Sequence, residues 1–447
     1  MINVLVLNGS PAGKDSITLY TVKYIQKHFS SCRFEVLHVG QKIKQYEKDF
    51  TPCKDALERA NLIIFAYPVY TFLVPAQLHR FVELMKENGA NISGKFATQI
   101  STSKHFYDVT AHRFIEENCA DLSLRYIRGL SADMDDLTTK KGRKEALEFF
   151  RFVLWSRKRG ICEPSPMPQQ GAGEKPAAFG APRTAVKQSL HKKAVIVADF
   201  GESEKDAPLE QLIAHFQAAL PMPSEVINIR DFPFAGGCLG CFRCAASGKC
   251  IYKDGFDDYL RAHIQSADAL IYAYTIKDHS MGYRFKLFDD RQFCNGHRTV
   301  TMGKPVAYLV NGEIEDEPNL KTLMEARAEV GGNYLAGIAT TPATAAAAAA
   351  KLSYAVAHDY LPPKNFYGVG GLKIFRDLIF QMQGLMREDH RFYKAHGFYD
   401  FPQKRPGRVL AMYAVGALMN NEKLRKKAGN KITEGMTMPY EAVLKKY

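Results

Sequence analysis

The stretch VLVLNGSPAGKDSITLYTVKYIQKHF, residues 4–29, decides the fold that the sequence predicts. It begins with an apolar run, Val4 to Leu7, that is typical of a buried strand. From Ser16 to Phe29 the apolar residues recur at the spacing of one helix face. The residues between, Asn8 to Pro11, are turn formers. A strand that leads directly into a helix predicts an α/β sheet.

Further strands and helices alternate through the first 160 residues. We expect four more strands at 34–39, 62–66, 96–100 and 124–127. Helical patterns fill the gaps, and they include residues 74–85 and 140–158. Alternation of this kind is typical of a parallel sheet covered by helices on both faces. Residues 1–161 are therefore predicted to form one α/β domain.

The same plan returns after a change of composition. Residues 162–190 are rich in proline and glycine and show no periodicity, which predicts a linker. Strand patterns then recur, and a helix-forming run closes the region; the strands are expected at 194–199, 225–229, 269–274, 305–310 and 334–338. We predict a second α/β domain over residues 191–363 and interpret the chain as an internal duplication.

The last 84 residues, 364–447, repeat neither domain. They hold 16 Lys and Arg against seven Asp and Glu, a net charge of +9. Amphipathic patterns predict helices at 371–386 and 408–419, and Gly368 to Gly371 suggest a hinge before the first. We expect a basic helical extension that packs against the second domain. The basic run Lys423 to Lys427 also permits binding to a membrane surface, which is the less favoured interpretation. No nucleic-acid-binding motif is present.

Composition and cysteine use indicate a globular cytoplasmic protein. Of the 447 residues 46% are hydrophobic and 24% charged, which excludes disordered and fibrous classes. The formal net charge is +13, so most of it belongs to the extension. The start of the sequence has no signal-peptide pattern, and no apolar run reaches the length of about 18 residues that spans a membrane. Nine cysteines, four of them clustered, suit a reducing compartment.

The loop that joins the first strand to the first helix has the features of a phosphate site. A helix N-terminus presents unpaired N–H groups and favours an anion. Ser10, Ser16 and Thr18 add hydroxyl donors. Neither the dinucleotide glycine pattern nor the Walker pattern is present, so the loop suits a phosphate monoester such as that of FMN. The alternative is an ordinary capped helix, because Ser and Thr are common N-caps.

A second segment, AYPVYTFLVPAQLHRFVELM at 66–85, follows the third strand, where doubly wound sheets bind ligands. Pro68 stiffens the turn, Val69 offers backbone groups to the polar edge of a flavin, and Tyr70 offers an aromatic face. With the loop at 9–18, this segment resembles the flavodoxin-like NADPH-dependent FMN reductase family.

The resemblance implies two tandem flavodoxin-like, doubly wound parallel sheets in three α/β/α layers. It also implies that the first loop holds the FMN phosphate and that the second flanks the flavin ring. A third loop, STSKHFY at 101–107, resembles a further flavin-contacting loop and adds Ser103 and His105. No residue is assigned a catalytic role, because the flavin carries the hydride chemistry.

The second domain carries Cys238, Cys241, Cys244 and Cys250 in the spacing C-x2-C-x2-C-x5-C. This compact spacing suits a [4Fe–4S] cluster, whereas zinc usually takes two C-x2-C pairs farther apart. The run resembles the cysteine motif of iron-sulfur flavoproteins, which belong to the same flavodoxin-like group. Zinc, or thiols that hold no metal, are the alternatives. We expect no second metal site at Cys294 and His297.

The two domains depart from the family in opposite ways. The second domain has acidic residues, Glu202, Glu204 and Asp206, where the first has hydroxyls. It also lacks the Pro-Val-Tyr segment. The first domain in turn lacks the cysteine run. One domain is therefore expected to keep the flavin site and the other the cysteines.

These patterns favour an FMN-dependent oxidoreductase. NAD(P)H is the expected donor, and a quinone, another flavin or a metal complex is the expected small acceptor. The first alternative is an iron-sulfur flavoprotein that carries electrons between protein partners. The second is a non-enzymatic thiol redox sensor. The resemblance also suggests a homo-oligomer, and it does not choose between NADH and NADPH.

Overall fold

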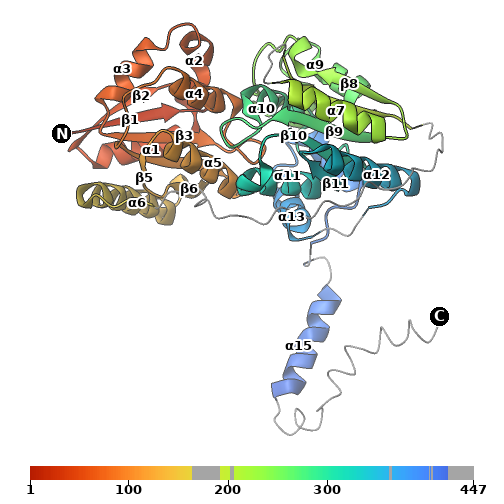
Figure 1. Ribbon diagram of the computed structural model, residues 1–447. Helices are drawn as coiled ribbons and strands as arrows, with labels where there is room; N and C mark the ends of the chain where they lie inside the picture. Colours follow the sequence, from red (N-terminus) through yellow and green to blue (C-terminus); the bar gives the residue numbers. More distant parts are fainter. Residues whose placement is uncertain (164–191, 202–205, 362–364, 402, 404–405, 421–447) are drawn as a thin grey trace. The chain divides into compact units, whose positions relative to one another are not determined.

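The computed structural model describes residues 1–163, 192–201, 206–361, 365–401, 403 and 406–420. Two parallel sheets stand at the centre of this part of the chain (Figure 1). We call residues 1–163 the first half and residues 192–361 the second half. Most of the predicted linker, Glu202, Glu204 and the run Lys423 to Lys427 lie outside the described residues.

The first half confirms the predicted parallel sheet. Its strands are β1 (Ile2–Asn8), β2 (Cys32–Leu37), β3 (Leu62–Pro68), β4 (Phe96–Ser103), β5 (Arg125–Tyr126) and β6 (Leu130–Asp133). They are ordered β2-β1-β3-β4-β5, β6 also pairs with β4, and every pair is parallel. The strand order 2-1-3-4-5 is that of a flavodoxin-like doubly wound sheet.

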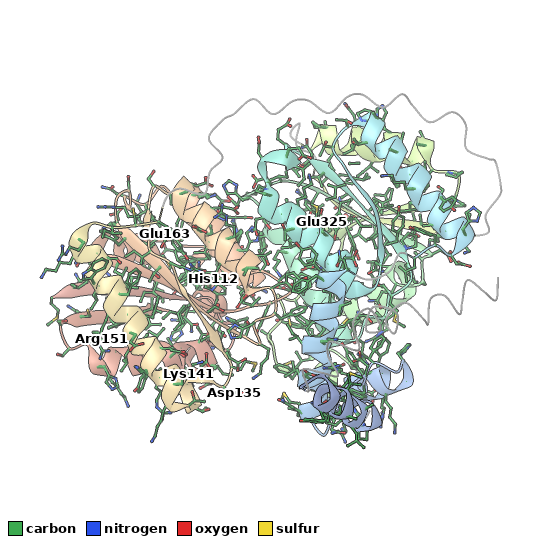
Figure 2. The ribbon with its side chains drawn as sticks, turned by 90° about the horizontal axis from the view of Figure 1, so that it is seen from below. His112, Asp135, Lys141, Arg151, Glu163 and Glu325 are labelled. Atoms are coloured by element: carbon green, nitrogen blue, oxygen red, sulfur yellow. The ribbon has the colours of Figure 1, made fainter. Side chains whose placement is uncertain are left out.

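Helices cover both faces of the first sheet. Alternate residues of β1 divide between two hydrophobic clusters, as the period of a strand requires. One face packs on α1 (Ile17–His28) and α6 (Lys140–Arg159). The other packs on α2 (Val39–Tyr46), α3 (Thr51–Arg59), α4 (Ala76–Glu87) and α5 (Asp108–Asp121). The charged residues Lys141 and Arg151 of α6 are exposed (Figure 2).

The second half repeats this architecture. Its strands are β7 (Ala194–Asp199), β8 (Ser224–Asn228), β9 (Ala269–Thr275), β10 (Pro305–Asn311) and β11 (Tyr334–Ala339). They are ordered β11-β10-β9-β7-β8, which is again 2-1-3-4-5 when read from β8. Its longer helices are α7 (Ala207–Ala219), α10 (Gly282–Arg291), α11 (Pro318–Gly331) and α12 (Pro342–His358), and two short ones are α8 (Arg243–Ser247) and α9 (Phe256–Tyr259).

The two halves share one core. A single hydrophobic cluster contains apolar residues of α4 and α5 from the first half and of α10 and α11 from the second. The outer helices α7 and α12 cover the other face of the second sheet. Residues 1–392 form one compact unit and residues 393–447 a second. The boundaries proposed for separate domains stay a prediction.

The extension is helical, as predicted. It contains α13 (Phe366–Gln381), α14 (Arg387–Ala395) and α15 (Pro406–Asn420). The expected hinge at Gly368 to Gly371 is wrong, because these residues lie within α13. Gly371 permits a close approach: a Cβ atom there would lie 2.5 Å from Val330 Cγ2 and 3.1 Å from Phe106 Cε2. Among the described helices, none has the length and apolar character needed to cross a membrane.

Candidate functional site

A cavity of about 500 Å³ lies where the two halves meet. The first half contributes the loop after β1, the turn after β3 and the end of β4. The second half contributes the cysteine loop and residues 291–301. Seven of the eight residues expected to bind FMN line it, namely Ser10, Ser16, Thr18, Pro68, Val69, Tyr70 and Ser103. The same cavity is lined by Cys238, Cys241, Cys244 and Cys250.

The loop after β1 leaves one hydroxyl available at the N-terminus of α1. Ser16 is the N-cap, and its Oγ accepts a hydrogen bond from Leu19 N at 3.4 Å. Ser10 Oγ accepts from Ala12 N at 3.3 Å. Thr18 Oγ1 is buried and has no hydrogen-bond partner. A buried hydroxyl without a partner is costly unless a ligand satisfies it, which fits a bound phosphate.

The turn after β3 is held rigidly. Tyr70 and Leu73 exchange backbone hydrogen bonds of 2.8 and 3.0 Å, and Thr71 and Phe72 between them have positive φ angles of 43° and 68°. Val69 N donates to Thr102 O at 3.2 Å, so this N–H group already has a partner. Strain of this kind persists where the surrounding structure holds it and is common at ligand sites.

The loop after β4 separates its two candidate residues. Ser103 lines the cavity, and its Oγ accepts from His105 N at 2.9 Å. The His105 side chain is 52% exposed, and its Nδ1 lies 3.0 Å from Asp108 Oδ2. His105 borders a second cavity of about 400 Å³ instead. The structure therefore does not bring His105 together with the other seven residues.

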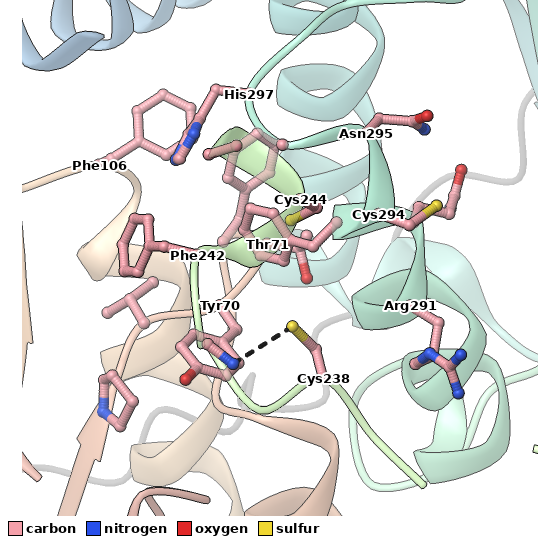
Figure 3. Close-up of a pocket in the computed structure, with 18 of the residues that line it drawn as sticks. Tyr70, Thr71, Phe106, Cys238, Phe242, Cys244, Arg291, Cys294, Asn295 and His297 are labelled. Carbon is pink, nitrogen blue, oxygen red and sulfur yellow. Dashed lines mark hydrogen bonds between the residues drawn. The ribbon is translucent and has the colours of Figure 1, made fainter. Parts of the chain in front are cut away.

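The cysteine loop lies directly on the turn after β3 (Figure 3). Gly240 has a φ of 62°, and a Cβ atom there would clash with the Tyr70 hydroxyl group. Gln77 Nε2 of α4 donates to Cys238 O at 3.4 Å, and the Phe293 ring meets the Tyr70 ring edge-on with centroids 6.1 Å apart. These contacts join the predicted flavin turn of the first half to the predicted metal ligands of the second.

Two of the four cysteines lie in an environment that disfavours free thiolates. Burial raises the pKa of Cys244 to about 11, and it raises the pKa of Cys238 well above the usual range. No three of these four described thiols have all their sulfur atoms within 4.8 Å of one another. Thiolates around one zinc ion would stand roughly 3.8 Å apart, given Zn–S bonds of about 2.3 Å.

Part of the cavity wall is formed by aromatic residues that no local sequence pattern predicts. Phe375 of α13 packs against Phe106 with ring centroids 4.1 Å apart and against His297 at 5.0 Å. His297 Nδ1 lies 3.1 Å from Oδ2 of Asp389, which is fully buried. Cys294 also lines the cavity. These contacts join residues far apart in the sequence, so no local pattern announces them.

Cationic side chains around the cavity are already paired within the protein. Lys104 contacts Asp133, Arg291 contacts Asp254, Arg298 contacts Asp389 and Arg327 contacts Asp289. These four are the lysines and arginines among the described residues that line the cavity. The remaining wall is largely apolar and includes Val306, Val330, Ile374 and Leu378.

The corresponding loop of the second half is filled by an ion pair. Arg230 Nε lies 2.7 Å from Asp199 Oδ1, at the end of β7. Asp206 Oδ2 accepts from Gly201 N at 2.7 Å and lies 3.9 Å from the Arg230 guanidinium. A guanidinium and two carboxylates thus stand in the described part of this loop, and of the three acidic residues predicted there only Asp206 lies among the described residues.

Comparisons with known proteins show that the first half is similar to flavin reductases. Residues 2–112 match the family model of the NADPH-dependent FMN reductases. An iron-sulfur flavoprotein of Archaeoglobus fulgidus is 26% identical over 174 residues, which cover 36% of this chain and 79% of the relative. The predicted resemblance to the FMN reductase family is confirmed, and the matched family is of the predicted enzyme class, the NAD(P)H-dependent FMN oxidoreductases.

Solved structures with a similar fold include two oxidoreductases. The NAD(P)H:(acceptor) oxidoreductase FerB of Paracoccus denitrificans is 18% identical, with a TM-score of 0.27 over 35% of this chain and 98% of that one. The NAD(P)H:quinone oxidoreductase of Methanothermobacter marburgensis is 12% identical, with a TM-score of 0.26 over 36% of this chain and 96% of that one.

Proposed function

We propose that this chain, whose first half matches the FMN reductase family, passes electrons from NAD(P)H through FMN to a small aromatic acceptor such as a quinone. The observation that carries the proposal is the shared cavity. The hydroxyl loop and the turn after β3 line one space, although 50 residues separate Thr18 from Pro68. When bound, FMN supplies hydride acceptance and onward electron transfer.

The residues of the first half fit FMN. Thr18 Oγ1 and Thr102 Oγ1 are buried polar atoms without partners, and both residues line the cavity. The N-terminus of α1 adds backbone N–H groups and a favourable dipole for the phosphate. Ser10, Ser16 and Thr18 would hold the phosphate. Pro68, Val69 and Tyr70 would flank the ring.

The rest of the cavity favours an uncharged aromatic acceptor. Its lysines and arginines are in ion pairs, so none is left unpaired to favour a charged acceptor over an uncharged one. Phe106 and Phe375 line the cavity and offer ring faces and edges. Among a quinone, a flavin and a metal complex, the quinone matches this wall best.

Steady-state kinetics tests the acceptor. The FMN-loaded protein should oxidise NADH or NADPH rapidly with a benzoquinone or naphthoquinone and slowly with a ferric chelate. A Phe375→Ala variant should raise the KM for the quinone and leave the KM for the nicotinamide nearly unchanged. Equal rates with the chelate would contradict the acceptor class, and no turnover with any acceptor would contradict the enzyme.

A second candidate is an iron-sulfur flavoprotein that carries electrons between protein partners. It is favoured by the four cysteines on the cavity wall and by the name of the relative from Archaeoglobus fulgidus. Cys238, Cys241, Cys244 and Cys250 would hold a [4Fe–4S] cluster beside Tyr70. Raised thiol pKa values at Cys238 and Cys244 speak against a redox sensor, because sensor cysteines need accessible thiolates.

An absorption spectrum of the protein isolated without oxygen separates the candidates. Flavin bands alone support the reductase, and a broad shoulder with about four iron and four sulfide per chain supports the cluster. Cys244→Ser should abolish the shoulder and keep the flavin. Cys162→Ser is the matched control, since Cys162 is exposed and lies off the cavity. Flavin without iron or sulfide would remove the cluster from the proposal.

A further inference from the structure

A buried cluster of possible ligands lies between the halves, away from the cavity. His79 and Glu83 belong to α4, and Asp278 lies in the turn after β9. One ligand atom from each lies within 4.8 Å of the other two. His79 is fully buried, and both of its ring nitrogens lack a hydrogen-bond partner, as does Asp278 Oδ2. Such unpaired polar atoms are rare in a core and call for an explanation.

The duplicated fold supplies a reference for this cluster. At the turn after β3 of the first half, Ala76 N and Thr71 Oγ1 donate hydrogen bonds to Asp290 of α10 in the second half, both at 2.8 Å. Lys286, one helical turn earlier, places its ammonium 2.9 Å from Tyr70 O and 2.5 Å from Asp290 Oδ1. A buried positive charge thus joins the turn after β3 to the helix of the other half.

The second half has the same turn with a different partner. Lys277 and Ser280 exchange backbone hydrogen bonds as Tyr70 and Leu73 do. Glu83 Oε1 accepts from Tyr283 N at 2.9 Å, as Asp290 accepts from Ala76 N. One turn before Glu83, however, α4 has His79 in place of a lysine.

Lys286 lies at the contact of α10 with the turn after β3, and at the equivalent contact of α4 with the turn after β9 the chain has the imidazole of His79. The Lys286 ammonium donates hydrogen bonds in its site, whereas both ring nitrogens of His79 are buried without a hydrogen-bond partner. The imidazole is therefore the group of this cluster whose bonding the protein leaves unsatisfied.

We infer that His79, Glu83 and Asp278 bind a divalent transition-metal ion of the zinc class between the two halves. Imidazole nitrogen and carboxylate oxygen are zinc ligands at about 2.0–2.2 Å, and a neutral imidazole is the form that binds metal. Ligands around a tetrahedral ion stand roughly 3.4 Å apart, so the three side chains need to close only slightly. The ion would join α4 to the turn after β9.

Neighbouring charges set the choice of ion. Glu83 Oε2 contacts Arg80 at 3.0 Å and Lys277 at 2.9 Å, and Asp278 Oδ1 contacts Lys86 at 2.9 Å. The other oxygen of Glu83, Oε1, lies 3.9 Å from His79 Nε2, and the other oxygen of Asp278, Oδ2, has no hydrogen-bond partner. The three cations oppose a hard ion bound by carboxylates alone, whereas an imidazole bond favours zinc, cobalt or nickel over magnesium and calcium.

The test compares the wild-type chain with His79→Lys, which copies Lys286 and removes the imidazole ligand. Both proteins are stripped with a chelator and titrated with ZnSO₄. The wild type should bind one equivalent more than the variant, and zinc should raise its Tm by several degrees more. Zinc taken up by the cysteines is common to both proteins and cancels. MgCl₂ at the same concentration should raise neither Tm.

Equal zinc uptake with equal Tm shifts in the two proteins would overturn the site, because the cysteines or the surface would then account for the metal. If His79→Lys does not fold, Asp278→Asn replaces it. That variant removes one ligand charge from a turn residue and should weaken the additional zinc equivalent at least tenfold. Undiminished affinity in Asp278→Asn would also overturn the site.

Discussion

At the scale of single residues, Thr18 offers a direct test of the phosphate site. Its hydroxyl is buried on the cavity and has no protein partner. Thr18→Val keeps the shape and removes the donor. A hydrogen bond to a charged group contributes about 1.5–3 kcal/mol, so FMN should bind roughly 10- to 100-fold more weakly. Quenching of flavin fluorescence during titration of the apoprotein measures this.

Thr21→Val is the matched control for that variant. Thr21 is also buried and lies on α1, but it does not line the large cavity. FMN affinity should be unchanged in Thr21→Val. If both variants weaken FMN equally, the effect belongs to the packing of α1 and the Thr18 hydroxyl does not touch the phosphate.

The burial of Glu117 in α5 lowers the stability of the folded protein by an amount that depends on pH. Burial raises the pKa of Glu117 to about 7, and its Oε2 has no hydrogen-bond partner. Arg113 and His279 favour the charged form, while Glu116 and Glu317 oppose it. Because the folded chain holds this proton more tightly than the unfolded chain, stability falls as pH rises from about 4.5 to about 7.

Glu117→Gln should therefore stabilise the protein at pH 8. The gain in Tm over the wild type should shrink as pH falls through 7 and vanish near pH 4.5. Thermal unfolding at several pH values measures both effects. A gain that is the same at pH 8 and pH 5 would show that removal of the charge is not its cause.

At the scale of elements, substitutions at two glycines of α13 test how the C-terminal extension packs against the cavity wall. Gly370 and Gly371 are neighbours in the helix, but a Cβ atom at Gly370 would meet nothing within 4 Å. Gly370→Ala should stabilise the protein by about 0.5–1 kcal/mol through helix propensity. Gly371→Ala should destabilise it by about 1–3 kcal/mol, because its Cβ presses on Val330 and Phe106. Urea unfolding of the pair measures both, and equal signs would contradict this packing.

The sequence predicts elements well where the deciding residues are contiguous. The strand, turn and helix of residues 4–29 form where the local pattern places them, and the phosphate-loop candidates follow from that. Contacts between elements are harder to predict. Alternating strands and helices imply that both sheet faces are covered, but they do not say that α4 packs on α10. The sequence does not predict the contact between Phe375 and His297 for this reason, since it depends on how α13 packs against the rest of the chain.

At the scale of the whole molecule, Asp290 holds the halves together. It is fully buried and accepts hydrogen bonds from Thr71 Oγ1 and Ala76 N across the interface. Asp290→Asn would leave the buried Lys286 ammonium with only the more distant Asp289 carboxylate, whose Oδ2 lies 3.6 Å away. Breaking a buried pair in this way costs roughly 3–5 kcal/mol. FMN affinity should fall as well, because the turn at Thr71 flanks the cavity.

Denaturant unfolding and FMN titration of Asp290→Asn measure the two effects. The double variant Lys286→Met with Asp290→Asn should recover part of the lost stability, since it removes the poorly paired charge. A double variant that is less stable than either single variant would contradict the role of the pair.

The cysteine loop and Tyr70 belong to one chain, and this determines how their contact responds when the protein is diluted. In a dimer of identical subunits, two such sites would separate as the protein concentration falls below the dissociation constant. Here they are tethered, so their encounter is governed by an effective concentration that does not depend on the amount of protein. A tandem chain also escapes the symmetry of a dimer, in which every substitution appears twice. The second half can therefore lose its anion-binding loop, as the ion pair of Arg230 with Asp199 illustrates, while the first half keeps its own.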